Sequence, residues 1–364
     1  MRKLLVAALA VSVWAQAEVR TITDVMGREV QVDVPVKRAV LTFYYPDYIA
    51  VAGAENFDKV VGISRQFWEE FNPGSWKLYA EKMPALKDIA DVGYVVSNTF
   101  STEKALALKP DVLVIPEIQY KALSEELPRF EAAGVPVVVV DFNDQSVEKH
   151  TKSARIFGEL AGTTERADKI AQEYADGMAD IAKRIEAANL PKPSIYMEFG
   201  DKGPQEYSYT WGNNMWGAIM QAAGGDNVSA PHIEKWGQIN PEQLLTAKPE
   251  VIIMTGLENK ADQQAEIMAM GIGISEDDAR KRLAGFMART GWADLPAVKN
   301  NRVYGIYQTA SRSLSDLASA QFIAKALYPE AFQDVDPEKT YLDFHRSYLP
   351  VVPEGTFFLY PKEK

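Results

Sequence analysis

The sequence predicts an α/β protein made of two Rossmann-like lobes, whose parallel-rich sheets are joined by a single long α-helix. Short apolar runs bounded by turns alternate with helix-like stretches in both halves of the 364-residue chain. Such runs are typical of parallel strands that are buried on both faces. A long amphipathic stretch separates the halves, and one motif occurs once in each half. At roughly 100–200 residues per domain, the length also favours two units.

Residues 1–17 have the layout of a secretory signal peptide. Arg2 and Lys3 are basic, Leu4 to Trp14 form an apolar run of 11 residues, and Ala15-Gln16-Ala17 places small residues before a cleavage site. A helix of that length spans only about 16 Å, whereas the hydrocarbon layer of a membrane is roughly 30 Å thick. We therefore expect cleavage after Ala17 and export to the periplasm. The chain contains 0 Cys, which excludes a lipid anchor on cysteine.

Residues 18–150 are predicted to form the N-terminal lobe. Polar and apolar residues alternate from Val19 to Val34 around Met26-Gly27-Arg28, which indicates a β-hairpin. Four strand-like runs follow, at 38–42, 60–63, 112–115 and 135–140. Helices are expected between them, over 46–54, 101–108 and 124–133.

The connecting helical region covers 151–190. Its apolar residues recur every three or four positions and so lie on one face of a helix: Ile170, Tyr174, Met178, Ile181 and Ile185. The predicted helix runs from Glu165 to Ala188, with Thr164 as its N-cap and Pro191 after its end. At 1.5 Å per residue it would be about 36 Å long, which is enough to reach both lobes.

Residues 191–330 are predicted to form the C-terminal lobe. Strands are expected at 194–198, 251–254 and 302–306, with helices over 214–223, 243–247 and 313–327. The sequence does not indicate how the C-terminal tail, residues 331–364, packs on the lobes.

An internal repeat connects the two predicted lobes. The segment 101–115 (STEKALALKPDVLVI) aligns without gaps to 240–254 (NPEQLLTAKPEVIIM), at an offset of 139 residues. Each copy has a helix-capping residue, Ser101 or Asn240, with a glutamate two positions later. Each then has a short helix, a Lys-Pro-acid turn and an apolar strand. Two lobes of similar construction would explain the repeat.

Composition excludes several classes of protein. A net charge of −11 makes a nucleic-acid or anionic membrane partner a poor expectation. With 0 Cys and 3 dispersed His, the chain lacks the usual ligands of zinc, manganese or iron–sulfur sites. There is no GxSxG, Walker A or GxGxxG motif, so an enzyme such as a secreted hydrolase is the least favoured alternative. We expect no intrinsic cofactor and, by default, a monomer.

Several segments, taken in order, resemble a known family. They are the hairpin 23–30 (TDVMGREV), the first repeat copy followed by 134–138 (GVPVV), then 224–228 (GGDNV), Trp236 ahead of the second repeat copy, and 291–304 (GWADLPAVKNNRVY). This series is similar to the periplasmic substrate-binding proteins of ABC importers for iron–siderophore complexes, haem and vitamin B12. In that family, two lobes are joined by one backbone helix.

The resemblance implies a function and a partner. The protein would capture a metal chelate between its lobes, a ferric siderophore first of all, and deliver it to an ABC importer. Haem or an oxyanion of the molybdate type remains the alternative ligand on the same fold. One surface glutamate per lobe docks onto the permease in this family, and these positions match Glu103 and Glu242. Each glutamate can also simply stabilise the start of its helix.

Ligand-binding residues are expected in loops that follow strands, where the two lobes face each other. Aromatic rings suit a large flat chelate, and arginine suits its anionic groups. The candidates are Tyr44, Tyr45, Arg65, Trp68, Trp211 and Arg312. Some of these aromatic residues could instead pack in the core. A tyrosine, Tyr44, Tyr45 or Tyr94, could ligate the iron of haem directly.

Overall fold

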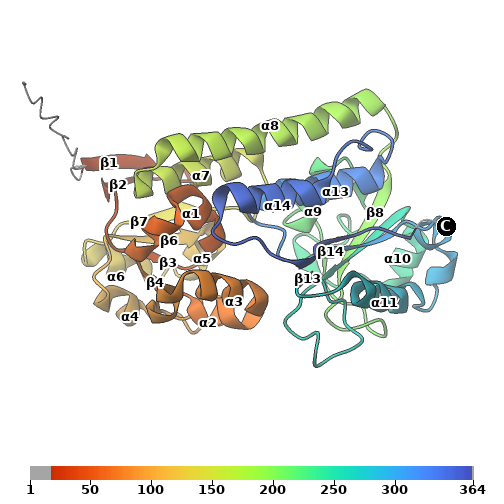
Figure 1. Cartoon of the computed structure of the whole chain (residues 1–364), viewed down its shortest axis with the longest axis horizontal. Helices are drawn as coiled ribbons and strands as arrows, with labels where there is room; N and C mark the ends of the chain where they lie inside the picture. Colours follow the sequence, from red (N-terminus) through yellow and green to blue (C-terminus); the bar gives the residue numbers. More distant parts are fainter. Residues whose placement is uncertain (1–17, 363–364) are drawn as a thin grey trace, which may run out of the picture.

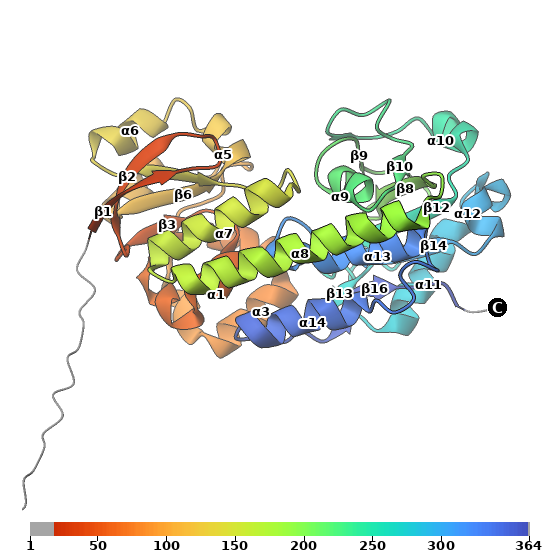
Figure 2. The ribbon, with the colours of Figure 1, turned by 90° about the horizontal axis from the view of Figure 1, so that it is seen from above.

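The computed structural model describes residues 18–362 and consists of two lobes, each built around a five-stranded sheet, with one long helix lying along both (Figures 1 and 2). The predicted fold class is confirmed. The predicted signal peptide, 1–17, lies outside the described residues. Within them, no helix combines the length and the apolar character needed to span a membrane.

The N-terminal lobe contains the predicted hairpin and a fully parallel sheet. Strands β1 (Glu18–Thr23) and β2 (Glu29–Val34) pair antiparallel. The sheet order is β5-β4-β3-β6-β7, and every neighbouring pair is parallel. Its strands are β3 (Ala39–Leu41), β4 (Val60–Ile63), β5 (Ala90–Asp91), β6 (Val112–Pro116) and β7 (Val137–Val140).

Short helices connect these strands. They are α1 (Tyr45–Ala52), α2 (Arg65–Phe71), α3 (Pro73–Lys82), α4 (Thr102–Ala107), α5 (Glu117–Ala122) and α6 (Leu127–Ala132), with 3₁₀ turns at Ala54–Lys59 and Pro84–Asp88. The sequence analysis predicted α1, α4 and α6 but not the helical pair α2–α3, which lies beside the space between the lobes (Figure 1).

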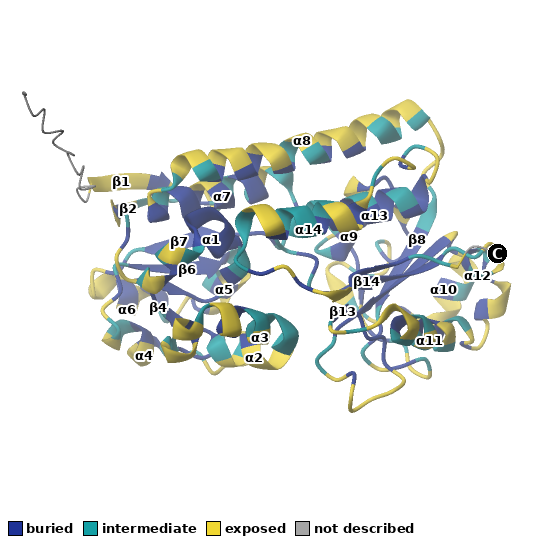
Figure 3. Ribbon diagram, in the orientation of Figure 1, coloured by how far each residue is buried: buried dark blue, intermediate teal, exposed yellow. Residues whose placement is uncertain are grey.

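Helix α7 (Val147–Ala161) leads into the connecting helix α8 (Thr164–Ala188). The first half of α8 packs Ala167 and Ile170 into the N-terminal core, and its second half packs Met178 and Ile181 into the C-terminal core. Its other face is exposed along its length (Figure 3). The expected N-cap was wrong by one residue, because the helix already includes Thr164. The Thr163 hydroxyl, in the capping position, donates instead to the Val51 carbonyl.

The C-terminal lobe has the sheet order β10-β8-β12-β14-β16. Strands β8 (Ser194–Phe199), β10 (Asp226–Asn227), β12 (Val251–Gly256) and β14 (Val303–Tyr307) are parallel, whereas β16 (Phe358–Leu359) pairs antiparallel with β14. Two small pairs lie outside this sheet, β9 (Thr210–Trp211) with β11 (Trp236–Gly237) and β13 (Gly271–Ile272) with β15 (Gly355–Thr356). Because β16 belongs to the tail, the tail supplies the edge strand of the five-stranded sheet.

The helices of this lobe surround its sheet. They are α9 (Trp216–Ala222), α10 (Pro241–Ala247), α11 (Glu276–Met287), α12 (Pro296–Lys299), α13 (Leu317–Leu327) and α14 (Pro337–Tyr348), with 3₁₀ turns at Trp292–Asp294 and Leu314–Asp316. Helix α14 lies between the lobes (Figure 1). Its Tyr341 belongs to the C-terminal core, while Phe344 and Tyr348 pack against the N-terminal core.

The internal repeat corresponds to equivalent elements, α4–β6 in one lobe and α10–β12 in the other. The side chains of Ser101 and Asn240 cap the two helices as predicted. Each helix is followed by a lysine in the left-handed region, Lys109 with φ 50° and Lys248 with φ 48°, and then by the proline that precedes the strand. The repeat therefore preserves an unusual backbone turn as well as a sequence pattern.

A buried polar network holds the lobes together beneath α8. The Asp316 carboxylate accepts a hydrogen bond from the Tyr174 hydroxyl at 2.9 Å and lies 3.1 Å from Nε2 of His150. Asp316 and His150 are almost fully buried and come from different lobes. Nearby, Asp47 of α1 accepts from the backbone N–H of Leu314 at 2.7 Å. These contacts leave few ways to rotate one lobe against the other at this point.

A second contact joins the lobes where α2 meets α3. The Thr309 hydroxyl donates to the Asn72 side chain at 2.7 Å, and the Gly74 N–H lies 3.3 Å from the Glu258 carboxylate. A Cβ atom on Gly74 would lie 2.8 Å from that carboxylate and 2.9 Å from Cβ of Ile272. Glycine is therefore needed for the two surfaces to meet this closely.

Replacing Asp316 with Asn should lower the free energy of unfolding by about 3 kcal/mol, because it removes one charge from a buried, hydrogen-bonded pair. Asp334→Asn is the matched control: Asp334 also bonds to a residue of α8, Arg184, but is exposed, so the loss should stay below about 1 kcal/mol. Urea denaturation measures both. If both variants lost the same free energy of unfolding, the buried network would contribute no more to stability than an exposed ion pair.

Stability should also fall between pH 5 and pH 8 through Glu258. Burial raises the pKa of this carboxyl to about 7, whereas an unfolded glutamate titrates near 4.3. Between these values the folded protein holds a proton that the unfolded chain has lost, so stability decreases as pH rises. Glu258→Gln should reduce the decrease by on the order of 1–3 kcal/mol, and exposed Glu242→Gln should leave it unchanged. An identical pH profile for wild type and Glu258→Gln would refute this.

Candidate ligand-binding cleft between the lobes

A cleft of about 920 Å³, including space that opens to solvent, lies between the lobes. It is reached from the carboxyl ends of strands in both sheets, where ligands of open α/β sheets are usually bound. The loop after β3 contributes Phe43 and Tyr44, and the loop after β14 contributes Thr309, Ser311 and Arg312. Helices α2 and α3 form another wall. The cleft is therefore bordered by both lobes, as the sequence analysis expected.

Aromatic side chains form the N-terminal side of the cleft. Phe43 and Phe67 line it, with ring centroids 5.5 Å apart. Behind them, Tyr94 stacks on Phe67 at 3.9 Å. These rings present a flat apolar surface. Phe43 and Phe67 were not among the ligand residues predicted from the sequence, whereas Tyr94 was named only as a possible ligand of haem iron.

Tyr44 and Tyr45 line the cleft with their rings but direct their hydroxyl groups into the N-terminal lobe. The Tyr44 hydroxyl accepts from the Phe142 N–H at 3.3 Å and lies 3.5 Å from the Asp141 carboxylate. The Tyr45 hydroxyl donates to the Thr42 carbonyl at 2.9 Å. Burial raises the pKa of both phenols. Both groups are therefore neutral and already hydrogen-bonded, which does not favour direct ligation of haem iron.

Trp68 lines the cleft next to Tyr45, whereas two other predicted residues lie elsewhere. Trp68 stacks on Tyr45 at 4.8 Å and donates its indole N–H to Ser75. Arg65 instead donates to the backbone carbonyls of Lys87 and Ile89. Trp211 is buried in the C-terminal core on β9. Arg65 and Trp211 are thus outside the cleft, because each is occupied by contacts within its own lobe.

Arg312 reaches the cleft from the C-terminal lobe. Its guanidinium carbon lies 5.6 Å from the centre of the Phe43 ring. Of the arginines in residues 18–362, it alone donates no hydrogen bond to another described residue, and its Nε is buried. The backbone is left-handed at both Arg312, with φ 56°, and Tyr44, with φ 59°. Such strained positions concentrate at functional sites.

The sequence analysis missed the wall formed by the C-terminal tail. Tyr341, Phe344 and His345 of α14 line the cleft, and Leu349, Val351 and Pro353 follow them. The tail carries no recognisable motif, and only its packing between the lobes brings it to the cleft. The amphipathic spacing of Tyr341, Phe344, His345 and Tyr348 was the one available signal, and it predicts a helix rather than a site.

A second hollow of about 740 Å³, including space that opens to solvent, lies beside the contact between α2–α3 and the C-terminal lobe. Its lining includes Glu70, Phe71, Phe199, Asp201, Leu257 and Lys260. Phe71 faces this hollow and its neighbour Asn72 lines the main cleft. The bridge from Asn72 to Thr309 therefore lies between the two spaces.

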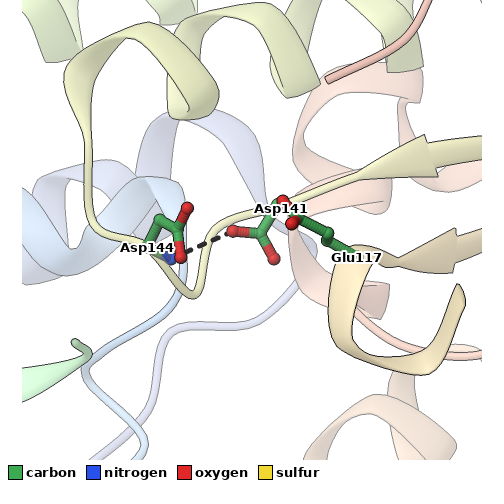
Figure 4. A group of neighbouring side chains, drawn as sticks. All are labelled: Glu117, Asp141 and Asp144. Atoms are coloured by element: carbon green, nitrogen blue, oxygen red, sulfur yellow. Dashed lines mark hydrogen bonds between the residues drawn. The ribbon is translucent and has the colours of Figure 1, made fainter. Parts of the chain in front are cut away.

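Three carboxylates approach one another near Tyr44 but do not form a convincing metal centre (Figure 4). They belong to Glu117, Asp141 and Asp144, and the Asp144 N–H donates to Asp141 at 3.0 Å. The ammonium group of Lys149 lies 2.6 Å from Glu117 and also contacts Asp144. Lysine thus supplies the positive charge that a cation would bring.

Glu103 and Glu242 lie on opposite lobes, on α4 and α10 (Figure 1). The Glu103 side chain is 71% exposed and pairs with Arg129 at 2.7 Å. Glu242 is also exposed and forms no ion pair with another described residue. Both carboxylates can be reached by another protein, since an exposed ion pair such as that of Glu103 is weak.

Known proteins share this architecture. A sequence model of the family described as periplasmic binding protein matches residues 56–310, more than half of the chain. The TroA-like periplasmic binding protein FepB of Veillonella parvula superposes with a TM-score of 0.87 at 31% identity, covering 94% of this chain and 99% of that one.

Two curated relatives carry names that specify different ligands. The molybdate-binding protein MolA of Haemophilus influenzae is 25% identical over 375 residues, which cover 96% of each chain. The vitamin B12-binding protein of Yersinia pestis is 22% identical over 184 residues, covering 49% of this chain and 62% of that protein. Both names describe binding proteins. The chain belongs to the periplasmic binding proteins, the solute-binding components of ABC importers.

Proposed function

We propose that this protein captures an anionic metal chelate, a ferric siderophore, in the cleft between its lobes and delivers it to an ABC importer. The observation that carries this proposal is Arg312, an arginine at the cleft without a hydrogen-bonded partner among the described residues. Its Nε atom is buried, and a buried donor without an acceptor is costly. An anionic group of the ligand would remove that cost.

The surroundings of Arg312 support a large ligand with flat or apolar parts. The rings of Phe43 and Phe67 form one side of the cleft, and Trp68 and Tyr79 lie further along α2 and α3. Aromatic surfaces contribute most when they cover apolar area of a ligand. A ferric catecholate or hydroxamate carries both negative charge and such area.

An oxyanion of the molybdate type is the second candidate. Next to Arg312 the cleft is also lined by Ser313 and Ser315, whose hydroxyls lie 2.7 Å apart, so that one of the two is left to donate to a ligand. Hydroxyl and guanidinium donors together suit a small tetrahedral anion. One curated relative that matches along nearly the whole chain is a molybdate-binding protein. Haem has less support, because the hydroxyls of Tyr44 and Tyr45 are engaged within the protein.

Arg312→Gln should weaken binding of the ligand roughly ten- to hundredfold, because a hydrogen bond to a charged group contributes about 1.5–3 kcal/mol. Tryptophan-fluorescence titration of residues 18–364 with ferric catecholate, hydroxamate and citrate chelates, haem, vitamin B12 and molybdate measures the affinity. Arg346→Gln, an exposed arginine paired with Asp343, is the control and should bind normally. Tight binding of molybdate alone would replace the siderophore by the second candidate. Equal affinity of Arg312→Gln would remove the basis of the proposal.

Delivery requires export and docking. Export is assigned to the signal peptide predicted for residues 1–17. Docking is assigned to Glu103 and Glu242, which offer one carboxylate on each lobe to basic residues of the permease. Two charged contacts far apart on the molecule would fix its orientation on the permease.

The double variant Glu103→Lys/Glu242→Lys should abolish uptake of the ligand by cells while leaving its affinity for the isolated protein unchanged, because the two residues lie outside the cleft. Glu186→Lys/Glu330→Lys changes the charge equally at two exposed glutamates near the ends of α8 and α13, and should transport normally. Wild-type uptake by the first variant would exclude these residues as the docking contacts.

A further inference from the structure

The wall formed by α14 contains two polar groups, the Tyr341 hydroxyl and Nε2 of His345, that have no hydrogen-bond partner among the described residues. The helix lies beyond residues 56–310, the part of the chain that matches the family model. It contributes Tyr341 and His345 to the cleft, and Tyr79 of α3 lines the cleft as well. All three side chains are at least nine-tenths buried: 5% of Tyr341, 7% of His345 and 2% of Tyr79 is exposed.

The tautomer of His345 follows from its hydrogen bond. Its Nδ1 lies 3.1 Å from the carbonyl oxygen of Val351. A carbonyl oxygen only accepts, so Nδ1 carries the hydrogen and donates it. Burial lowers the pKa of His345 to about 4, so the ring is neutral near pH 7. Nε2 therefore has a free lone pair, and no group in residues 18–362 bonds to it.

Two tyrosines that line the same cleft provide hydrogen-bond donors. The Tyr79 hydroxyl is buried and has no partner within the described residues. Tyr341 lies one helical turn before His345, with their rings 4.7 Å apart, and its hydroxyl also forms no hydrogen bond there. Burial raises the pKa of both phenols, which keeps them protonated. A buried polar group is normally satisfied, so the Tyr79 hydroxyl points to an oxygen acceptor on a ligand, and the Tyr341 hydroxyl is free to donate to one as well.

A neutral imidazole whose Nδ1–H is bonded to a backbone carbonyl is the arrangement of most metal-ligating histidines. We infer that Nε2 of His345 binds the metal of the captured chelate directly, while Tyr79 and Tyr341 donate hydrogen bonds to oxygen ligands of the same metal. This inference rests on the proposed function and narrows it. The ligand would be a metal chelate with at least one coordination position held by exchangeable water.

The step is a simple ligand substitution. Water leaves the metal, and the Nε2 lone pair forms the new bond. The imidazole neither gains nor loses a proton, and the oxidation state of the metal does not change. A chelate that already occupies all six positions could not bind in this way.

Two ferric probes distinguish a chelate that leaves coordination positions to water from one that occupies all six. Ferric nitrilotriacetate leaves positions for water, whereas ferrioxamine B, a hexadentate hydroxamate, leaves none. Wild-type protein should bind the first at least about tenfold more tightly than His345→Asn does. The asparagine amide retains a donor near the position of Nδ1 and so preserves the contact with Val351, but it has no atom at Nε2. His232→Asn, at an exposed histidine, is the control and should match wild type.

Pulsed EPR of the wild-type complex gives a readout that depends on no variant. Protein labelled with ¹⁵N-histidine and loaded with ferric nitrilotriacetate should show coupling of the iron to ¹⁵N. Equal affinity of His345→Asn with no such coupling would overturn the inference. If Arg312→Gln still weakened binding, the proposed function would stand. Failure of wild type to bind any ferric chelate would overturn both.

Discussion

The relative position of the two lobes is the constraint on which the rest of the structure depends. Helix α8 is part of both cores, so it cannot bend without exposing apolar residues of one of them. Asp316, His150 and Tyr174 add a buried polar link beneath that helix. Helix α14 packs on both cores as well, and its Tyr348 is bonded to Arg166 and Glu173 of α8. The protein thus resists large hinge motion, which ordinarily needs flexible connections.

Because the lobes are fixed relative to each other, side chains at the cleft can keep unsatisfied polar groups and strained backbone conformations. Among the described residues Arg312 has no anionic partner and Tyr79 has no acceptor, and Tyr44 has a left-handed backbone conformation. Each feature costs free energy that the surrounding fold supplies. Their concentration at one cleft, when the other arginines within residues 18–362 are hydrogen-bonded, distinguishes this region from an ordinary gap between domains.

Proteins of this family share one architecture but are named for different ligands. Relatives named for molybdate and vitamin B12 share the family with this chain. Ligand preference must therefore come from side chains at the cleft rather than from the fold. In this chain those side chains are the aromatic wall after β3, the hydroxyl-rich loop around Arg312, and α14. The first two are formed by loops after strands, whereas α14 belongs to a tail that also completes the C-terminal sheet.

The sequence determined the two-lobe α/β fold, the hairpin, the connecting helix and the repeat, because each depends on local periodicity, capping or turn residues. It also predicted that Tyr44, Tyr45, Trp68 and Arg312 lie at the cleft, since loops after parallel strands converge on one edge of a sheet. Only the tertiary structure decided that Arg65 and Trp211 bond or pack within their own lobes, and that the hydroxyls of Tyr44 and Tyr45 face inward. It alone brought His345 to the cleft. These outcomes depend on contacts between residues distant in the chain, which no local pattern encodes.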